Sequence, residues 1–147
     1  MDIESGYIGL FIASFLAATI VPFSSEIILS GMLIAGYSPL TCLFVATTGN
    51  WLGGISSYAI GYLGKWIWIE KYLRIPIEKI ESTTKSIDGK ELWISLFCWL
   101  PGVGDVIALV LGLLKANTWT TITGMLIGKL LRYAIWGYIT LKALEIL

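Results

Sequence analysis

Apolar residues fill two blocks of the chain, one on each side of a polar middle segment. Residues 1–64 and 92–147 hold long runs of Leu, Ile, Val, Phe and Trp, whereas residues 65–91 mix basic and acidic side chains. Apolar runs of this length are typical of helices that lie in a membrane. The pattern therefore predicts an all-α integral membrane protein, with a single domain over residues 1–147.

The first block begins with an apolar run from Tyr7 to Ala35, which Pro22 divides near its middle. Each arm has about 15 residues, fewer than the roughly 20 that a helix needs to cross the hydrocarbon core. Two short arms that meet at a proline predict a re-entrant helical hairpin, and a single kinked helix is the alternative.

A second apolar run, Leu40–Leu63, follows a turn at Gly36–Pro39 and contains no charged residue. It is long enough to be a transmembrane helix. Small and polar residues recur along one face of this run: Asn50, Gly53, Gly54, Ser57 and Gly61. Such a face suits either close contact with another helix or the lining of a path.

The second block repeats this order of features. A short apolar arm is interrupted at Pro101, another arm follows, and a second run long enough to span extends from Trp119 to about Leu141. A shift of 79 positions pairs Pro22 with Pro101, Glu26 with Asp105, Ser38 with Asn117 and Gly49 with Gly128. Each hairpin returns to its own side, so each half crosses once and the second half enters from the opposite face. The halves, residues 1–64 and 92–147, are therefore predicted to form an inverted repeat, unless either hairpin spans.

The linker, residues 65–91, has six basic and five acidic residues, with apolar residues at helical spacing. This pattern predicts an amphipathic helix on the membrane surface that ends at a turn at Asp88–Gly89. Lys115 lies on the same side as the linker, whereas the other side has only Lys142. The positive-inside rule then places the linker in the cytoplasm and both termini outside.

Composition narrows the function classes. The chain is 56% hydrophobic and 14% charged, whereas soluble domains have about 25% charged residues. Zero net charge and the lack of a basic cluster exclude a nucleic-acid partner. The sequence has no histidine, and Cys42 and Cys98 lie in apolar runs, as packing residues do. We expect no enzyme activity, no catalytic residue, no metal and no cofactor.

Four ionisable residues lie deep in the apolar segments: Glu26, Asp105, Lys129 and Arg132. Each costs about 2.5–3.5 kcal/mol at the centre of a membrane helix, so such residues usually face a cavity or a path. Lys129 and Arg132 share a helix face with Tyr133 beside them, and two cations on one face can bind a phosphate. These three residues and Asn50 are the candidates for substrate binding. The two acids are candidate proton acceptors, or counter-ions that an anion displaces.

Plainer explanations exist for each of these features. The four charges could pair and only hold the two halves together. Asp105 follows a proline break and could be an N-cap, where a helix N-terminus favours an acid. Gly102 and Gly104 could present backbone N–H groups to an anion, although a helix break at Pro101 explains them equally well.

Four segments stand in order along the chain: Ala13-Ser14-Phe15-Leu16 running to Pro22, Ser25 and Glu26, then Gly49-Asn50-Trp51-Leu52-Gly53-Gly54, Trp99-Leu100-Pro101-Gly102-Val103-Gly104-Asp105 and Gly128-Lys129-Leu130-Leu131-Arg132-Tyr133. Together they resemble the DedA family, the bacterial relatives of the SNARE-associated Golgi (VTT-domain) proteins, and most of all its small YqaA-type branch. The resemblance covers nearly the whole chain.

The resemblance implies two opposed re-entrant hairpins, each followed by a transmembrane helix, in the prokaryotic cytoplasmic membrane. Bacterial members are implicated in recycling undecaprenyl phosphate, and eukaryotic relatives scramble phospholipids. Proton coupling has been proposed for the family, and by motif those roles would fall to Glu26, Asp105 and Arg132. Larger members carry arginines around the second proline, where this chain has Cys98 and Gly104. Substrate identity therefore does not follow from the resemblance.

We expect a small transporter that translocates a lipid phosphate, either a polyprenyl phosphate or a phospholipid, as a flippase or a scramblase coupled to protons. A proton-coupled carrier of a small solute or ion and a non-transporting structural membrane module are the alternatives. Membrane lipids are the expected partners. With only two crossings, the chain is also expected to form a homo-oligomer in order to enclose a path.

Overall fold

A computed structural model of the chain describes residues 3–19, 25–64, 71 and 76–147. All regular elements in these ranges are helices, which confirms the predicted all-α class. They are α1 (Ile3–Ala17), α2 (Ser25–Ile34), α3 (Pro39–Leu63), α5 (Ile77–Ile87), α6 (Glu91–Leu96), the 3-10 helix η1 (Phe97–Trp99), α7 (Val103–Leu113) and α8 (Thr118–Ile146).

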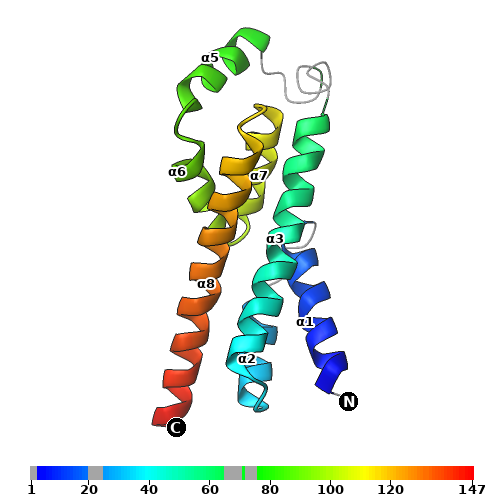
Figure 1. Cartoon of the computed structure of the whole chain (residues 1–147), viewed down its shortest axis with the longest axis vertical. Helices are drawn as coiled ribbons and strands as arrows, with labels where there is room; N and C mark the ends of the chain where they lie inside the picture. Colours follow the sequence, from blue (N-terminus) through cyan, green and yellow to red (C-terminus); the bar gives the residue numbers. More distant parts are fainter. Residues whose placement is uncertain (1–2, 20–24, 65–70, 72–75) are drawn as a thin grey trace.

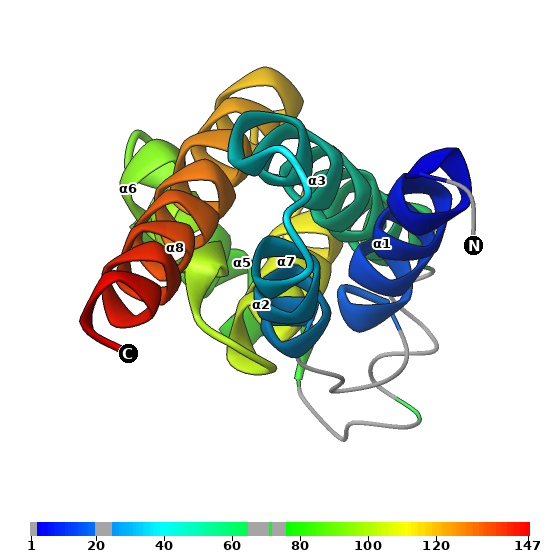
Figure 2. The same ribbon diagram turned by 90° about the horizontal axis from the view of Figure 1, so that it is seen from below.

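Two long helices, α3 and α8, run along most of the molecule in opposite directions (Figure 1). The short helices α1 and α2 lie at the end that carries both termini, whereas α6 and α7 lie toward the other end, beneath α5. Seen along the long axis, α2 lies between α1 and α8 (Figure 2). The inner ends of both short pairs therefore meet near the middle of the molecule.

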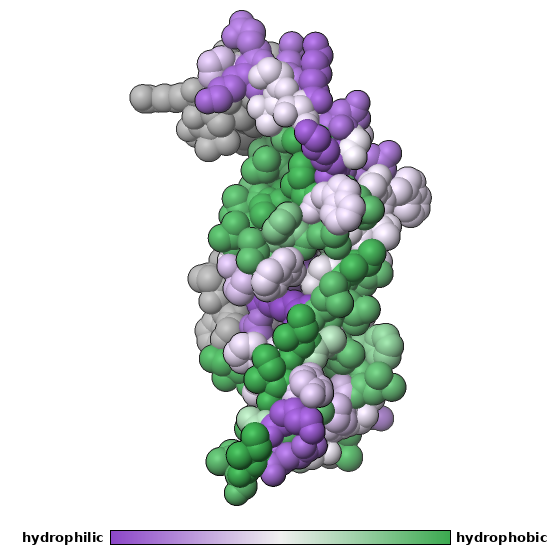
Figure 3. Space-filling model, turned by 90° about the vertical axis from the view of Figure 1, so that its left-hand side faces the viewer, coloured by the Kyte–Doolittle hydropathy of each residue, from purple (hydrophilic) through white to green (hydrophobic). Residues whose placement is uncertain are grey.

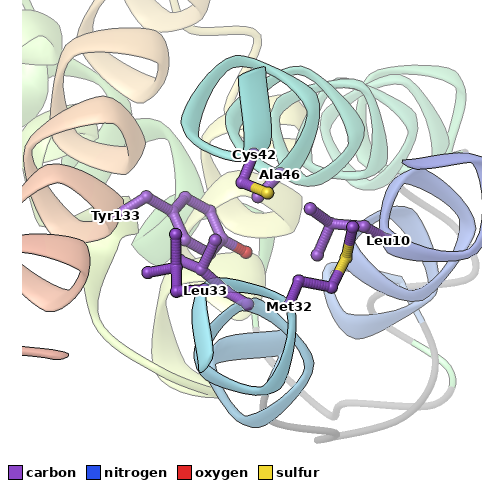
Figure 4. Close-up of a cluster of buried hydrophobic side chains, with 7 residues drawn as sticks. Leu10, Met32, Leu33, Cys42, Ala46 and Tyr133 are labelled. Atoms are coloured by element: carbon purple, nitrogen blue, oxygen red, sulfur yellow. The ribbon is translucent and has the colours of Figure 1, made fainter. Parts of the chain in front are cut away.

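The first short pair folds back on itself. Leu10 of α1 and Met32 of α2 belong to one buried cluster, which Cys42 and Ala46 of α3 and Tyr133 of α8 complete (Figure 4). Helices α1 and α2 are thus two separate arms of a hairpin and not one kinked helix. The predicted break at Pro22 lies outside the described residues.

The second break is where the sequence predicts it. Helix α6 passes into η1, the chain turns at Pro101, and Gly102 has a φ of 72°, a left-handed conformation that glycine adopts without strain. The backbone N–H groups of Val103 and Gly104 donate to the carbonyls of Pro101 and Leu100, both at 2.8 Å. The Gly104 N–H thus has a protein partner, and the chain breaks at Pro101 and Gly102 as predicted.

The turns after α2 and α7 match at the predicted shift of 79 residues. Gly36 N donates to Leu33 O at 3.1 Å, and Lys115 N donates to Gly112 O at 2.9 Å. Both turn residues have positive φ, 85° at Gly36 and 53° at Lys115. Helices α3 and α8 also begin at equivalent positions. The correspondence found in the order of sequence features therefore extends to the backbone.

Helix α5 ends at Ile87, and Gly89 follows with a φ of 76°. This confirms the predicted helix and the turn at Asp88–Gly89. The placement of the linker on a membrane surface and in the cytoplasm stays a prediction.

The two runs expected to span form the longest helices. Within the described ranges, no helix is both long enough and apolar enough to cross a membrane. Polar residues near the middle of these helices, among them Asn50 in α3 and Lys129 and Arg132 in α8, lower their apolarity.

The face seen in Figure 3 is nevertheless largely apolar below a hydrophilic upper end, with smaller hydrophilic patches at mid-height and near the lower end. Large apolar side chains that are exposed on the molecule include Ile8, Ile27, Phe44, Ile60, Leu131 and Ile139. Monomeric soluble proteins rarely expose contiguous apolar surface beyond a few hundred Å². The polar groups described next are mostly turned inward.

Candidate functional site

The four charges of the apolar segments meet in the middle of the molecule as two ion pairs. Glu26, in the first turn of α2, pairs with Arg132 of α8. Asp105, in the first turn of α7, pairs with Lys129 of α8 at 3.1 Å. Each hairpin thus contributes one acid, placed where the helix N-terminus stabilises negative charge. Asp105 lies within the helix and is not its N-cap, which is Gly102.

The Arg132–Glu26 pair is only partly buried. The guanidinium Nη2 of Arg132 donates to Oε1 of Glu26, and the two side chains retain 13% and 8% of their exposed surface. The guanidinium carbon also lies 5.6 Å from the ring centroid of Tyr133. A guanidinium has five N–H donors, so this pair leaves Arg132 donors with which to bind a further anion.

Lys129, in contrast, has no exposed surface. Its ammonium donates to Oδ1 of Asn50 at 2.5 Å and to Oδ1 of Asp105. The Asn50 amide in turn donates to the backbone carbonyl of Ser14 at 2.9 Å. Lys129 therefore joins α1, α3, α7 and α8 through one buried network.

Gly54 makes room for this network. A Cβ at this position would lie 3.1 Å from Cε and 3.2 Å from Nζ of Lys129. The other small residues on the same face of α3 are buried as well. Of the two roles predicted for this face, the structure shows close helix contact.

Tyr133 lies one turn after Lys129 on α8 and packs into the cluster of Figure 4. Its side chain is fully buried, and its hydroxyl shares a hydrogen bond of 2.5 Å with Oγ of Ser25. Tyr133 therefore fastens α8 to the start of α2.

Sequence reasoning grouped Lys129, Arg132, Tyr133 and Asn50 as one phosphate site, but the structure divides them. Arg132 pairs with Glu26 of α2, whereas Lys129 contacts Asp105 of α7 and Asn50 of α3. The hydroxyl of Ser25 and the carbonyl of Ser14 were missed. Ser25 is adjacent to Glu26 in sequence, which was the available signal, whereas a backbone carbonyl carries none.

The site combines two acids and two bases, which are paired with one another. Within the described ranges, no group of three Cys, Asp or Glu residues is arranged to hold a metal ion. Two hollows lie elsewhere, at the ends of the molecule: one of about 220 Å³ beside Tyr7 and Tyr37, and one of about 280 Å³ beside Lys85 and Lys115. Neither borders the four charges, which are reached from the side of the molecule at Arg132, Glu26 and the 20% exposed Asp105.

The chain is similar to known proteins over most of its length. The VTT domain family matches residues 21–141. The inner membrane protein YqaA of Escherichia coli strain K12 is 36% identical over 125 residues, which cover 84% of this chain and 83% of that protein. An uncharacterized protein of Haemophilus influenzae is 30% identical over 135 residues, covering 84% and 80%. No solved structure matches significantly. The chain belongs to the VTT domain (DedA) family.

Proposed function

We propose that this protein resides in a bacterial inner membrane and moves the phosphate headgroup of a lipid across it. The Arg132–Glu26 pair carries the proposal, because it is a partly exposed ion pair beside an apolar outer surface. The family and the inner-membrane name of the Escherichia coli relative support the location.

An ion pair between opposed units suits an exchange of partners. A phosphate oxygen is a stronger acceptor for a guanidinium than most neutral groups, and it can bind two N–H donors at once. When Arg132 binds the headgroup, Glu26 loses its counter-charge, and a proton can replace it. This step would couple lipid movement to protons. The two opposed hairpins would then act as an inverted repeat around the site.

Pairing also bears on how the chain fits a bilayer. The two charges in the middle of α8, Lys129 and Arg132, point toward Asp105 and Glu26. The face that α8 turns outward is therefore more apolar than the composition of the whole helix, as Figure 3 illustrates. The acyl chains of the lipid would remain at this surface while only the headgroup enters.

The buried Lys129 network favours a second, structural role for part of the site. Lys129 has no exposed surface and both its acceptors are fixed side chains. We propose that this network holds the two halves together, and that of the four charges Arg132 alone binds the headgroup while Glu26 takes up the proton.

The test is transport in liposomes that contain a fluorescent polyprenyl phosphate or, in parallel, a labelled phospholipid. The label that becomes accessible to an impermeant quencher is followed with and without a pH gradient. Arg132→Ala should slow the exchange by about tenfold to a hundredfold, because a hydrogen bond to a charged group contributes roughly 1.5–3 kcal/mol. Glu26→Gln should remove the effect of the gradient.

Lys142→Ala is the matched control, since Lys142 is an exposed cation on the same helix, paired with Glu145. It should leave exchange unchanged. Exchange no faster than in protein-free liposomes, from folded protein, would count against lipid translocation and favour a solute carrier or a structural module.

A further inference from the structure

The Arg132–Glu26 pair continues into a row of polar side chains between α2 and α8. Ser30 lies one turn after Glu26, and Trp136 and Thr140 lie one and two turns after Arg132. The Trp136 indole N–H donates to Oγ of Ser30 at 2.9 Å, and the Ser30 and Thr140 hydroxyls lie 3.1 Å apart. We call Ser30, Trp136 and Thr140 the polar seam.

The hydrogen bonds of the polar seam run between its own three residues. The Thr140 hydroxyl donates to the carbonyl of Trp136 at 3.0 Å, so the hydrogen bond between the hydroxyls runs from Ser30 to Thr140. All three side chains are at least partly exposed, and Trp136 retains 44% of its surface. Polar groups in an apolar surrounding cost free energy unless they serve a partner. Here Trp136 and Ser30 donate to side chains, which a ligand or water could replace, whereas Thr140 donates to a backbone carbonyl.

In the other half, the backbones of α3 and α7 are in direct contact at the equivalent position. At the shift of 79, the seam positions correspond to Leu109 of α7 and to Ser57 and Gly61 of α3. A Cβ on Gly61 would lie 3.0 Å from the backbone nitrogen of Leu113 and closer still to the Leu109 carbonyl. Two backbones in direct contact leave no side chain that could yield to a headgroup.

The seam leads in a defined direction. Helices α2 and α8 extend from the central ion pairs to the end of the molecule that carries both termini (Figures 1 and 2). Ile27 and Ile139, on the same two helices, are 68% and 55% exposed. The row is thus a narrow polar strip in an apolar surface.

We propose that the polar seam is the route along which an anionic phosphate headgroup travels between Arg132 and the end of the molecule with the termini. The indole N–H and the two hydroxyls donate hydrogen bonds to the phosphate oxygens in turn, while the acyl chains stay outside. The seam has donors but no charged acceptor beyond Glu26, so it suits an anion and not a cation. In this structure α2 and α8 meet along the seam through side chains, whereas α3 and α7 meet at the equivalent position through backbone atoms. The inference rests on the proposed function.

Thiol labelling tests the route without a transport assay. Single cysteines replace Ser30 or Thr140 in a chain whose native cysteines are changed by Cys42→Ala and Cys98→Ala. Ile27→Cys and Ile139→Cys are the matched controls on the same two helices. In membrane vesicles, an impermeant maleimide should modify the seam cysteines on the order of tenfold faster than the controls, because the reactive thiolate forms in contact with water. Dihexanoyl phosphatidic acid should slow the labelling of the seam cysteines alone.

Equal labelling of seam and control cysteines, or unreactive seam cysteines, would overturn the route and leave the hydrogen bonds as packing.

A second experiment cross-links α2 to α8 by a disulfide across the seam. Oxidation of the double variant Ser30→Cys, Thr140→Cys should reduce lipid phosphate exchange to the rate of protein-free liposomes, and reduction should restore it. Each single-cysteine variant is the control for oxidation: its own rate of exchange should be the same before and after the treatment. Full exchange by the cross-linked protein would contradict the proposal.

The two hypotheses fail in different ways. If even the unaltered chain exchanges no lipid phosphate while the labelling contrast and the protection persist, the transport function fails and the seam remains a hydrated anion site. If exchange occurs without the contrast, the function stands and the seam is not its route.

Discussion

Lys129 shows how a single buried charge can hold a membrane-type fold together. Its ammonium is out of contact with solvent and is shared between Asn50 and Asp105, which belong to different halves of the chain. Removing one partner of a buried ion pair leaves an uncompensated charge, which is far more costly than removing both. The cost of replacing Lys129 therefore depends on the side chains that the substitution leaves without a partner.

Lys129→Met should lower the free energy of unfolding by about 3–5 kcal/mol, since Asp105 and Asn50 would lose their shared partner. The measurement is the midpoint of thermal unfolding in detergent. Adding Asp105→Asn should recover much of the loss. Lys142→Met, at an exposed pair on the same helix, is the control and should change little. An unchanged midpoint in Lys129→Met would show that the network does not stabilise the fold.

Thr121 of α8, unlike Lys129, is a fully buried polar residue whose hydroxyl has no hydrogen-bond partner among the described residues. Thr121→Val keeps the shape and removes the unsatisfied hydroxyl, so the free energy of unfolding should rise by about 1 kcal/mol. Thr123→Val is the control, because that hydroxyl is exposed and donates to the Trp119 carbonyl at 2.8 Å. A lower thermal midpoint for Thr121→Val would indicate a partner such as bound water.

At the residue scale, the sequence identified which residues are unusual but not how they pair. Charges within apolar runs stand out in any sequence, whereas Glu26 and Arg132 are 106 positions apart. Lys129 and Arg132 lie on one helix face, so either acid could have paired with either base. Only the packing of α2 and α7 against α8 decides the partners. The hydroxyls of Ser25 and Ser30 carry no such signal, because serine is common in apolar helices.

At the scale of elements, glycines decide how closely the helices approach. A Cβ on Gly112 of α7 would lie 2.8 Å from the backbone nitrogen of Tyr62 on α3, and closer still to the Tyr58 carbonyl. Backbone atoms cannot move aside as a side chain can. The α3–α7 contact therefore depends on glycine at this position.

Gly112→Ala should lower the free energy of unfolding by about 1–3 kcal/mol, the usual cost of overpacking a close contact. Gly137→Ala is the matched control in α8, where an added Cβ meets nothing within 4 Å. That change should instead raise stability by up to about 1 kcal/mol through helix propensity. Both are read from thermal midpoints in the same detergent. Equal shifts for the two variants would mean that the α3–α7 contact is not tight in solution.

Element boundaries were predictable where proline or glycine residues mark them. Pro39 and the turn before it mark the start of α3, and Pro101 with Gly102 marks the second break. The 3-10 helix Phe97–Trp99 was not foreseen, because no residue type separates it from the end of α6. Helix α8 continues to Ile146, beyond the expected end near Leu141, since no glycine or proline stops it.

For the whole molecule, the order of features carried more information than residue identity. Few residues match between the halves, yet the backbone hydrogen bonds of the turns recur at the shift found from the sequence. Turn chemistry constrains the backbone, whereas the apolar faces accept many side chains. The structure places the two hairpins at opposite ends of the molecule (Figure 1). It does not by itself orient them in a bilayer.

Equivalent turns should therefore face opposite sides of the membrane. Ser38 and Asn117 precede α3 and α8, are both exposed, and lie 79 positions apart. Single cysteines at these positions, with Cys42→Ala and Cys98→Ala, would be labelled by an impermeant reagent in right-side-out and inverted vesicles. We expect Ser38→Cys to react from outside and Asn117→Cys from the cytoplasm, because Lys115 and the basic linker favour the inner side. Labelling of both from one side would exclude the inverted arrangement, whereas opposite labelling with the sides exchanged would keep it and reverse only the orientation.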